Sequence, residues 1–395
     1  MNPLERLKNA YYNREEYARQ WHASGRKVVG YVCDNVPAEL FTAAGMLPYR
    51  LSGKPQRNVK EVNSLLGSVH TSRLVGTEFI DTITASLVAG ELDFIDYLVV
   101  PHNRKNVQAL GALLLSTKQN LPDIPVPEFY YLDRTYLRNY LTSGYNRKSL
   151  MQLVSKVESW TGNAIDAATM RKTLEDAAQT RSLLREVNAL RGNGAPKITG
   201  VEALEIYGAA HFMPTEEFQQ TARAFIEEAK ARPVLTGKRL YMGGSPLDNP
   251  ALYALIEQQN GVIVAEDHCW GARCAEQDVN DHDDPFEALA ARFVAQPACS
   301  LLASIDDTTA AVVRRALNSG AQGAIFNVIN GDKSQMWETP SQFDQLREQG
   351  LPCLHLKRQP YNIVDPAPVS DAVAQFLEQV ASPGVSQTIP TVEKH

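Results

Sequence analysis

This 395-residue chain has few cysteines, no long apolar run and no excess of positive charge. Five cysteines are few for a chain of this length, and an odd number does not suit a disulfide framework. Such a count is typical of reduced thiols in the cytoplasm. No apolar run approaches the roughly 18 residues of a membrane-spanning helix, so we predict no membrane span. The 39 Lys and Arg residues are outnumbered by 45 Asp and Glu, and a net charge of −6 disfavours binding to nucleic acid.

The first twenty residues also lack the apolar segment of a secretory signal, which supports a cytoplasmic location. What the chain does contain is ordinary for a globular protein, with 44% hydrophobic and 21% charged residues. Its length predicts two or three domains, at roughly 150 residues each.

Short runs rich in aliphatic and aromatic residues alternate with helical patterns in two separate stretches of the sequence. The predicted strands are 27–32, 96–100, 127–132, 239–242, 262–264, 324–328 and 353–356. This alternation predicts an α/β fold with two doubly wound parallel-sheet lobes, joined by a region of helical spacing. We predict an N-terminal α/β lobe over 1–145, a helical linker region over 146–235 and a C-terminal α/β lobe over 236–395. The chain is expected to begin with one helix that runs to about Trp21.

Residues suited to catalysis or binding follow several of these predicted strands. They are Cys33, His102, Arg104, Cys269 and Asp332. Because the carboxyl ends of parallel strands gather ligands, we predict that these five side chains converge in a cleft between the lobes. Two other thiols, Cys299 and Cys353, are predicted to lie in the core.

Two of the strand-end segments each leave two interpretations open. Residues 243–246 could present backbone N–H groups to an anion, or could simply form a glycine turn between a strand and a helix. The segment from Glu266 to Cys274 holds two carboxylates, an imidazole, two thiols and a guanidinium. Such a set suits metal binding, acid–base catalysis or anion binding, while the alternative is a structural loop with buried thiols.

The motifs at these positions, in this order, resemble the 2-hydroxyacyl-CoA dehydratase and benzoyl-CoA reductase family. They read GYVCDNVPAEL at 30–40, AAGMLP at 43–48, GELDFID at 90–96, GSP at 244–246, EDHCWGAR at 266–273 and GAIFN at 323–327. The resemblance implies two α/β lobes, with an acyl-CoA substrate and a [4Fe–4S] cluster between them. It also implies a lyase or reductase that pairs with a related subunit and receives an electron from an ATP-dependent activator.

The residues at the family's cluster positions are not cysteines in this chain. The resemblance places the three cluster thiolates at Thr77 (or its neighbour Gly76), at Arg104 and at about Asp332. Iron–sulfur clusters are held by thiolates, so the resemblance supports the fold more strongly than the cluster.

Three interpretations therefore remain open. The chain could hold a cluster through substitute ligands, for which the candidates are Cys33, Cys269, Cys274 and His70. It could be a cluster-free subunit that supports a related partner or forms a homodimer. It could also be a cluster-free enzyme or anion-binding protein, in which Arg104 clamps a carboxylate or phosphate.

Candidate roles follow from the motifs and the resemblance together. The candidate catalytic residues are Glu39, His102, Arg104, Asp267 and Asp332. The candidate substrate-binding residues are Gly244, Ser245 and Arg273. The candidate metal ligands are Cys33, Cys269 and Cys274.

Overall fold

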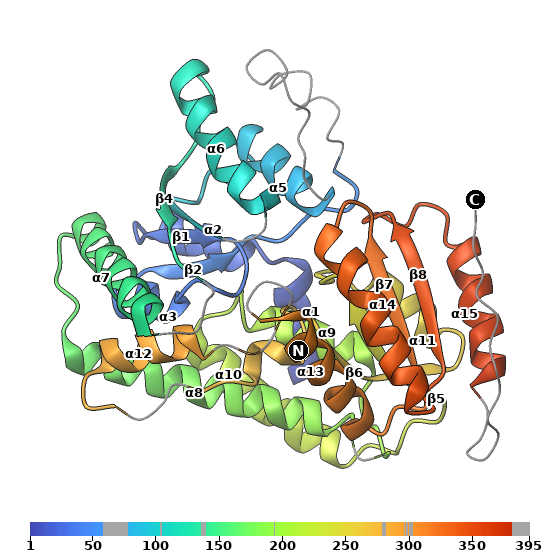
Figure 1. The fold of residues 1–395 in the computed structure, drawn as a ribbon. Helices are drawn as coiled ribbons and strands as arrows, with labels where there is room; N and C mark the ends of the chain where they lie inside the picture. Colours follow the sequence, from blue (N-terminus) through green and yellow to red (C-terminus); the bar gives the residue numbers. More distant parts are fainter. Residues whose placement is uncertain are drawn as a thin grey trace. The chain divides into compact units, whose positions relative to one another are not determined.

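The computed structural model describes residues 1–57, 78–102, 105–135, 140–192, 194–278, 282–295, 297, 299 and 303–380. The chain divides into two compact units, each built from several segments. The first unit comprises Met1–Arg185, Glu205–Phe225 and Cys274–Ala303. The second unit comprises Glu186–Leu204, Ile226–Arg273 and Ser304–His395. Figure 1 labels the helices and strands of both units.

The first unit contains a four-stranded sheet in the order β2-β1-β3-β4, with all strands parallel. Its strands are β1 (Val28–Tyr31), β2 (Leu47–Arg50), β3 (Tyr97–Pro101) and β4 (Glu128–Leu132). The helices of this part of the chain are α1 (Pro3–Tyr12), α2 (Glu16–Ala23), α3 (Ala38–Ala43), α5 (Glu78–Val88), α6 (Lys105–Asn120), α7 (Tyr140–Thr161), α8 (Ala167–Ala189) and α12 (Pro285–Val294). Helices α8, α9 (Gly200–Ala209) and α10 (Thr215–Lys230) contribute residues to both units.

Strand β2 is the element of this sheet that the sequence patterns do not reveal. It contains Pro48, which has no N–H to donate and argues against a central strand. Among the described strands β2 pairs with β1 alone, so it is an edge strand there and tolerates the proline. The N-terminal expectation is also wrong, since the chain forms two helices with a turn at residues 13–15 rather than one helix to Trp21.

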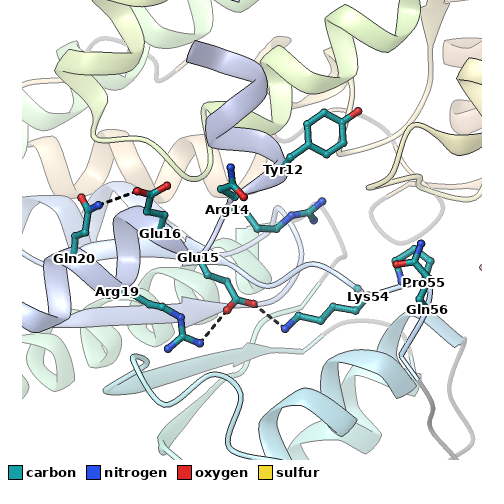
Figure 2. Close-up of a pocket in the computed structure, with 11 residues that line it drawn as sticks. Tyr12, Arg14, Glu15, Glu16, Arg19, Gln20, Lys54, Pro55 and Gln56 are labelled. Atoms are coloured by element: carbon teal, nitrogen blue, oxygen red, sulfur yellow. Dashed lines mark hydrogen bonds and ion pairs between the residues drawn. The ribbon is translucent and has the colours of Figure 1, made fainter. Parts of the chain in front are cut away.

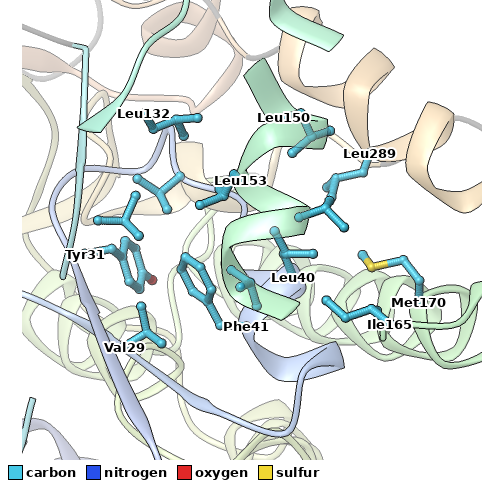
Figure 3. Close-up of a cluster of buried hydrophobic side chains, with 14 of the residues drawn as sticks. Val29, Tyr31, Leu40, Phe41, Leu132, Leu150, Leu153, Ile165, Met170 and Leu289 are labelled. Atoms are coloured by element: carbon cyan, nitrogen blue, oxygen red, sulfur yellow. The ribbon is translucent and has the colours of Figure 1, made fainter. Parts of the chain in front are cut away.

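The core of the first unit packs strands against α3, α7 and α12. Val29 and Tyr31 of β1 contact Leu40 and Phe41 of α3, and Leu289 comes from α12 (Figure 3). Residues 153, 157, 170 and 174, which recur at helical spacing in the sequence, are all buried on α7 and α8. The apolar spacing of this region therefore does mark buried helix faces.

The second unit contains its own four-stranded parallel sheet, in the order β6-β5-β7-β8. Its strands are β5 (Lys238–Gly244), β6 (Gly261–Glu266), β7 (Gly323–Ile329) and β8 (Cys353–Gln359). Its remaining helices are α11 (Ala251–Glu257), α13 (Ile305–Asn318), α14 (Lys333–Glu348) and α15 (Ala367–Gln379). The short 3₁₀ helix η1 (Ala272–Ala275) contributes two residues to each unit.

Alternate residues of β7 face opposite layers of helices. Ala324 and Phe326 pack with residues of α13 and α14. A Cβ placed on Gly323 would lie 3.0 Å from Phe376 of α15, which covers the other face. Helices on both faces of a parallel sheet define the doubly wound arrangement, and the predicted α/β fold with two parallel-sheet lobes is confirmed.

Helix α14 begins earlier than the sequence indicates. Pro340 lies inside it, and because proline normally interrupts a helix, the sequence alone indicates a helix only over 342–349. The helix in fact starts at Lys333, with Asp332 as its N-cap. A residue predicted to be catalytic is therefore also the residue that starts a helix.

No helix among the described residues is long and apolar enough to cross a membrane. The two thiols predicted to lie in the core, Cys299 and Cys353, are both buried. Burial raises the pKa of Cys353 to about 12, which keeps it an unreactive thiol.

Candidate functional site

At the carboxyl edge of the second unit's sheet, Ser245 and Asp332 form a buried polar contact. The Ser245 hydroxyl donates to Asp332 Oδ2 at 2.9 Å and accepts from the Ile329 N–H at 3.0 Å. Asp332 Oδ1 accepts from the Gln335 N–H at 3.3 Å, which is its N-cap bond. This contact ties together the ends of β5 and β7 and the start of α14.

Gly244 ends β5 in a conformation that a side chain would oppose. Its φ is +99°, and a Cβ there would lie 2.2 Å from the carbonyl oxygen of Asn327. The next amide, of Ser245, donates to that same oxygen at 2.7 Å. Helix α11 begins six residues after Ser245, at Ala251, and has only seven residues. The geometry therefore favours the glycine turn of the two interpretations, and a substrate-binding role for Gly244 and Ser245 stays a prediction.

Glu266 is the last residue of β6 and the first residue of the EDHCWGAR motif, and it has a structural role. Glu266 is fully buried and makes a bidentate ion pair with Arg191, at 2.6 and 2.9 Å. Its Oε1 also accepts from the Ala272 N–H at 2.7 Å. A Cβ on Gly271 would lie 2.4 Å from the Glu266 side chain, so only glycine fits there. Burial would raise the pKa of Glu266, but Arg191 lowers it overall and keeps the carboxylate charged.

Asp267 bridges two guanidinium groups at this edge. Its Oδ1 accepts from Arg273 Nη1 and from Arg315 Nη1, each at 3.1 Å. All three side chains are close to nine-tenths buried. The carboxylate of Asp267 thus holds two guanidinium groups at the same edge of the sheet.

His268 and Cys269 are both buried in the same loop. His268 Nε2 lies 2.9 Å from the Tyr253 hydroxyl, and burial lowers the pKa of His268 to about 4. The imidazole is therefore neutral at pH 7. Cys269 is 8% exposed.

At the carboxyl edge of the first unit's sheet, His102 forms a hydrogen-bonded chain with two residues. His102 Nδ1 lies 2.8 Å from Asp133 Oδ1, and Tyr145 donates its hydroxyl to Asp133 Oδ2. Burial would raise the pKa of Asp133, but the bonds from Tyr145 and His102 lower it. Because a carboxylate can only accept, His102 Nδ1 is the donor in this contact. This arrangement suits a general base.

Cys33 follows β1 at the same edge and has an unusual backbone. Its φ is +67°, a region that residues other than glycine rarely occupy and that clusters at functional sites. Asn35, two residues later, is buried and donates to the His102 carbonyl at 3.4 Å. Cys274 is half-buried and also belongs to the first unit. The metal-ligand roles of Cys33, Cys269 and Cys274 stay predictions.

Glu39 lies in an ion-pair network of the first unit. Its Oε1 accepts from Arg292 Nη1 at 2.7 Å and from Arg181 Nη1 at 3.2 Å. Arg181 also donates to Asp278, at 2.8 Å. Burial would raise the pKa of Glu39, but the charges of Arg292 and Arg181 together lower it. A carboxylate held this way is a weak proton acceptor, and its catalytic role stays a prediction.

Several expected residues fall elsewhere. Thr77, Gly76, His70 and Arg104 lie outside the described residues. Of the set predicted to converge, Cys33 and His102 belong to the first unit, while Cys269 and Asp332 belong to the second. Their convergence, like the catalytic roles of Asp267 and Asp332 and the binding role of Arg273, stays a prediction.

Sequence reasoning missed the partners of these residues. Asp133 could have been found, since it follows the predicted strand 127–132 directly. Arg191, Arg292 and Arg315 lie on or beside helices far along the chain from the groups they contact, and no local pattern marks them.

The residues at the family's cluster positions do not fit a [4Fe–4S] cluster. An arginine at 104 keeps its proton in proteins and offers no lone pair. Both carboxylate oxygens of Asp332 already accept hydrogen bonds, one from Ser245 and one from the first turn of α14. Within the described ranges, no three His, Cys, Asp or Glu residues are grouped so as to hold a metal ion.

Comparisons with known proteins agree with the motifs. The family model described as 2-hydroxyglutaryl-CoA dehydratase, D-component, matches residues 33–380. The (R)-phenyllactyl-CoA dehydratase beta subunit of Clostridium sporogenes is 21% identical over 88% of this chain and 90% of its own length. One of the subunits of benzoyl-CoA reductase from Thauera aromatica is 24% identical over 86% of this chain and 88% of its own length.

A third relative is the beta subunit of (R)-2-hydroxyglutaryl-CoA dehydratase from Acidaminococcus fermentans. It is 22% identical over 70% of this chain and 71% of its own length. The family model covers far more than half of the sequence, so this chain belongs to the 2-hydroxyglutaryl-CoA dehydratase D-component family.

Proposed function

We propose that this chain is a cluster-free subunit of a dehydratase- or reductase-type enzyme that acts on an acyl-CoA. The relatives are named as subunits of enzymes for phenyllactyl-CoA, benzoyl-CoA and 2-hydroxyglutaryl-CoA. A related subunit would then carry the redox centre and receive the electron from an ATP-dependent activator. We further propose that the acyl-CoA-like substrate lies in the cleft between the lobes, in a cytoplasmic heterodimer.

The observation that carries this proposal is the environment of Asp332. At the position where the resemblance expects a thiolate, a carboxylate caps α14 and accepts from buried Ser245. These bonds hold the loop after β7 in place without a metal. We infer that this loop has a structural and substrate-facing role here, rather than a ligand role.

Residues at the carboxyl edges of the two sheets would bind the substrate and accept a proton. Arg273 and Arg315, which share Asp267, would attract an anionic part of the substrate and orient it. His102, oriented by Asp133, would accept a proton from a group placed near its Nε2. Both roles need no redox group in this chain.

The test is anaerobic purification of the tagged chain, alone and from cells that also make its related subunit, with iron and sulfide assays on each. We expect no iron in the isolated chain, and about four irons per heterodimer, with broad absorption near roughly 400 nm, in the complex. About four irons and four sulfides in the isolated chain would overturn the cluster-free proposal.

A second function is favoured by the His102–Asp133–Tyr145 chain: a cluster-free enzyme, monomeric or homodimeric, that uses general-base chemistry on an anionic substrate. It predicts turnover by the isolated chain, without a partner. His102→Gln should then lower kcat by about 10²- to 10⁴-fold, with Tyr17→Phe as a control elsewhere in the same unit. If the isolated chain turns over no acyl-CoA, the subunit proposal is favoured.

A further inference from the structure

Strand β4 forms an edge of the first unit's sheet. Among the described strands it pairs with β3 alone, in a register that sets Leu132 beside Pro101. The Leu132 carbonyl accepts from the His102 N–H at 2.8 Å, so the backbone groups of Leu132 face β3. Because successive residues of a strand direct their backbone groups to alternate sides, the N–H and C=O groups of Phe129 and Tyr131 point away from β3.

The opposite edge of this sheet, β2, carries a residue that limits further pairing. Pro48 has no N–H to donate to another strand. The segment that follows β2 is held to the turn before α2, since Lys54 pairs with Glu15 at 2.8 Å (Figure 2). Proline is one of the devices by which natural proteins prevent sheets from joining at their edges.

The edges of the second unit's sheet are protected in other ways. On β6, the Ile263 N–H donates to the Glu257 side chain of α11 at 3.4 Å. A Cβ on Gly200 would lie 2.6 Å from Ile263, so the start of α9 also covers this strand. On β8, Lys357 and Arg358 are exposed, and a register shift interrupts the pairing with β7. Charged side chains and such irregularities discourage pairing at an edge.

Strand β4 contains neither a proline nor a basic residue. Its three central residues are all aromatic: Phe129, Tyr130 and Tyr131. Its one charged residue, Glu128, is the first of the strand and pairs with Lys156 at 2.7 Å. An aromatic edge of this kind is suited to pairing with another strand.

The apolar surface continues from β4 onto α6. Tyr131 is 39% exposed, and a Cβ on Gly111 of α6 would lie 3.7 Å from its ring. Leu115, one turn after Gly111 on the same face of the helix, is 49% exposed, and Ala112 is exposed as well. A strand edge flanked by exposed apolar side chains of a helix marks an interaction surface.

We propose that β4 pairs in antiparallel orientation with β4 of a second copy of this chain, so that the two first-unit sheets join across a two-fold axis. The inference goes beyond the proposed function and does not rest on it. A two-fold symmetric interface needs a surface that is complementary to itself, and the sequence of β4 meets this need.

With Tyr130 on the axis, Phe129 of each copy lies opposite Tyr131 of the other. The outward N–H and C=O groups of these two residues then form hydrogen bonds on both sides of the axis. Each Phe faces a Tyr, and aromatic pairs directly opposite each other stabilise antiparallel strands. Glu128 lies opposite Leu132, so no like charges face each other in the paired segment.

The neighbouring registers are less favourable. A slip of two residues in one direction would place Pro127, which has no N–H, opposite Tyr131. A slip in the other direction would place Asp133 opposite Phe129, and the Asp133 carbonyl already accepts from the Ser149 hydroxyl. The register centred on Tyr130 is therefore the one that both strands can satisfy.

Sedimentation velocity of the full chain, alone and in complex with its related subunit, tests the proposal. We expect the isolated chain to form a dimer of twice its 43.7 kDa mass, and the complex to contain two copies of this chain. An isolated chain that stays at 43.7 kDa at every concentration would overturn the proposal.

Two variants act on the edge itself. Tyr131→Lys places a charge in the interface, and Tyr131→Pro removes an N–H that points away from β3, so the pairing with β3 is kept. Each should weaken the dimer by about 10-fold to 100-fold. The matched control is Trp337→Lys, which puts the same charge at an aromatic residue of α14 that is 80% exposed, and it should leave the dimer unchanged.

Circular dichroism and the melting temperature establish that each variant is folded. The assignment fails if the dimer is unchanged in both folded Tyr131 variants, or if Trp337→Lys weakens it equally.

Cysteine cross-linking tests the register. Tyr130→Cys would bring two thiols to the axis, where opposite residues have Cα atoms about 4.5 Å apart, within the range of a disulfide. Phe129→Cys is the control, because its two copies lie diagonally across the axis, beyond the roughly 7 Å limit. Oxidation by copper phenanthroline should link Tyr130→Cys but neither Phe129→Cys nor the wild type, which keeps the five native cysteines. Equal linking of all three proteins would contradict this pairing.

The outcome is separable from the proposed function, since a mass measurement requires neither iron nor turnover. A dimeric chain whose complex turns over no acyl-CoA supports the interface and rejects the enzyme. A monomeric chain in an active complex rejects the interface alone, and release of the related subunit by Tyr131→Lys would then assign the β4 edge to that subunit.

Discussion

Ser245 donates a hydrogen bond to Asp332 across 2.9 Å, and both side chains are buried at the carboxyl edge of the second unit's sheet. The two residues are 87 positions apart in sequence. Because Asp332 also caps α14, one contact joins two strand ends to a helix start. The position that the resemblance gives to a cluster thiolate is thus a structural junction in this chain.

Asp332→Ala should destabilise the second unit by about 1–3 kcal/mol, because it removes an N-cap and leaves the Ser245 hydroxyl buried without its acceptor. Asp332→Asn should recover much of the loss, since an amide oxygen also caps a helix. Urea unfolding followed by circular dichroism measures the difference. The control is Ser304→Ala, which removes the exposed N-cap of α13 and should cost less. Equal stability of Asp332→Ala and wild type would contradict the structural role.

Arg191→Met should cost about 3–5 kcal/mol at pH 7, since it leaves the Glu266 carboxylate buried without its counter-charge. The pKa of Glu266 is lowered in the folded protein, so the pair stabilises the fold above the ordinary value of 4.5. That contribution is lost as the pH falls through the lowered pKa. The gap between wild type and variant should therefore be largest at pH 7 and should shrink below about pH 4.5, as urea midpoints would show. A gap that does not change with pH would contradict this origin.

His268 should make the second unit less stable as the pH falls from 6.5 to about 4. Burial lowers its pKa from 6.5 to about 4, so within this range the unfolded chain binds a proton that the folded chain does not. The slope is at most about 1.4 kcal/mol per pH unit. His268→Gln should flatten the slope, while His282→Gln, at an exposed position, serves as the control. If His268→Gln leaves the slope unchanged, the imidazole is not the group responsible.

The sequence is a good guide to the strands and a poorer guide to elements that contain proline. Strand β2 contains Pro48 and α14 contains Pro340, and each escapes pattern analysis because proline normally ends such elements. Both are tolerated for reasons that depend on the tertiary structure, such as the edge position of β2. The other strands, by contrast, are marked by local runs of aliphatic and aromatic residues and could be predicted.

The roles of strand-end residues could be predicted only in part. Glu266 and Asp267 are adjacent and chemically alike, yet one is locked in a buried pair with Arg191 and the other bridges Arg273 and Arg315. The difference comes from arginines that lie 75 and 48 residues away. Periodicity and motif spacing carry no information about such partners.

Glu39→Gln should act on stability more than on chemistry. Glu39 is the acceptor for Arg292 and Arg181, and the Gln side chain removes the negative charge between two largely buried guanidinium groups. We expect a loss of about 2–4 kcal/mol at pH 7.

A double-mutant cycle separates the structural role of Glu39 from a catalytic one. Arg292→Met alone should also destabilise the first unit, and Glu39→Gln combined with it should cost clearly less than the sum of the two, because both changes break one interaction. The effect of Glu39→Gln should fade as the pH falls through the lowered pKa of Glu39, where the wild-type carboxyl becomes neutral as well. Arg185→Gln, which removes an ion pair of the more exposed Asp278 carboxylate, is the control and should cost less. If Glu39→Gln leaves the urea midpoint unchanged but abolishes turnover by the complex, Glu39 is the catalytic residue that its motif predicts.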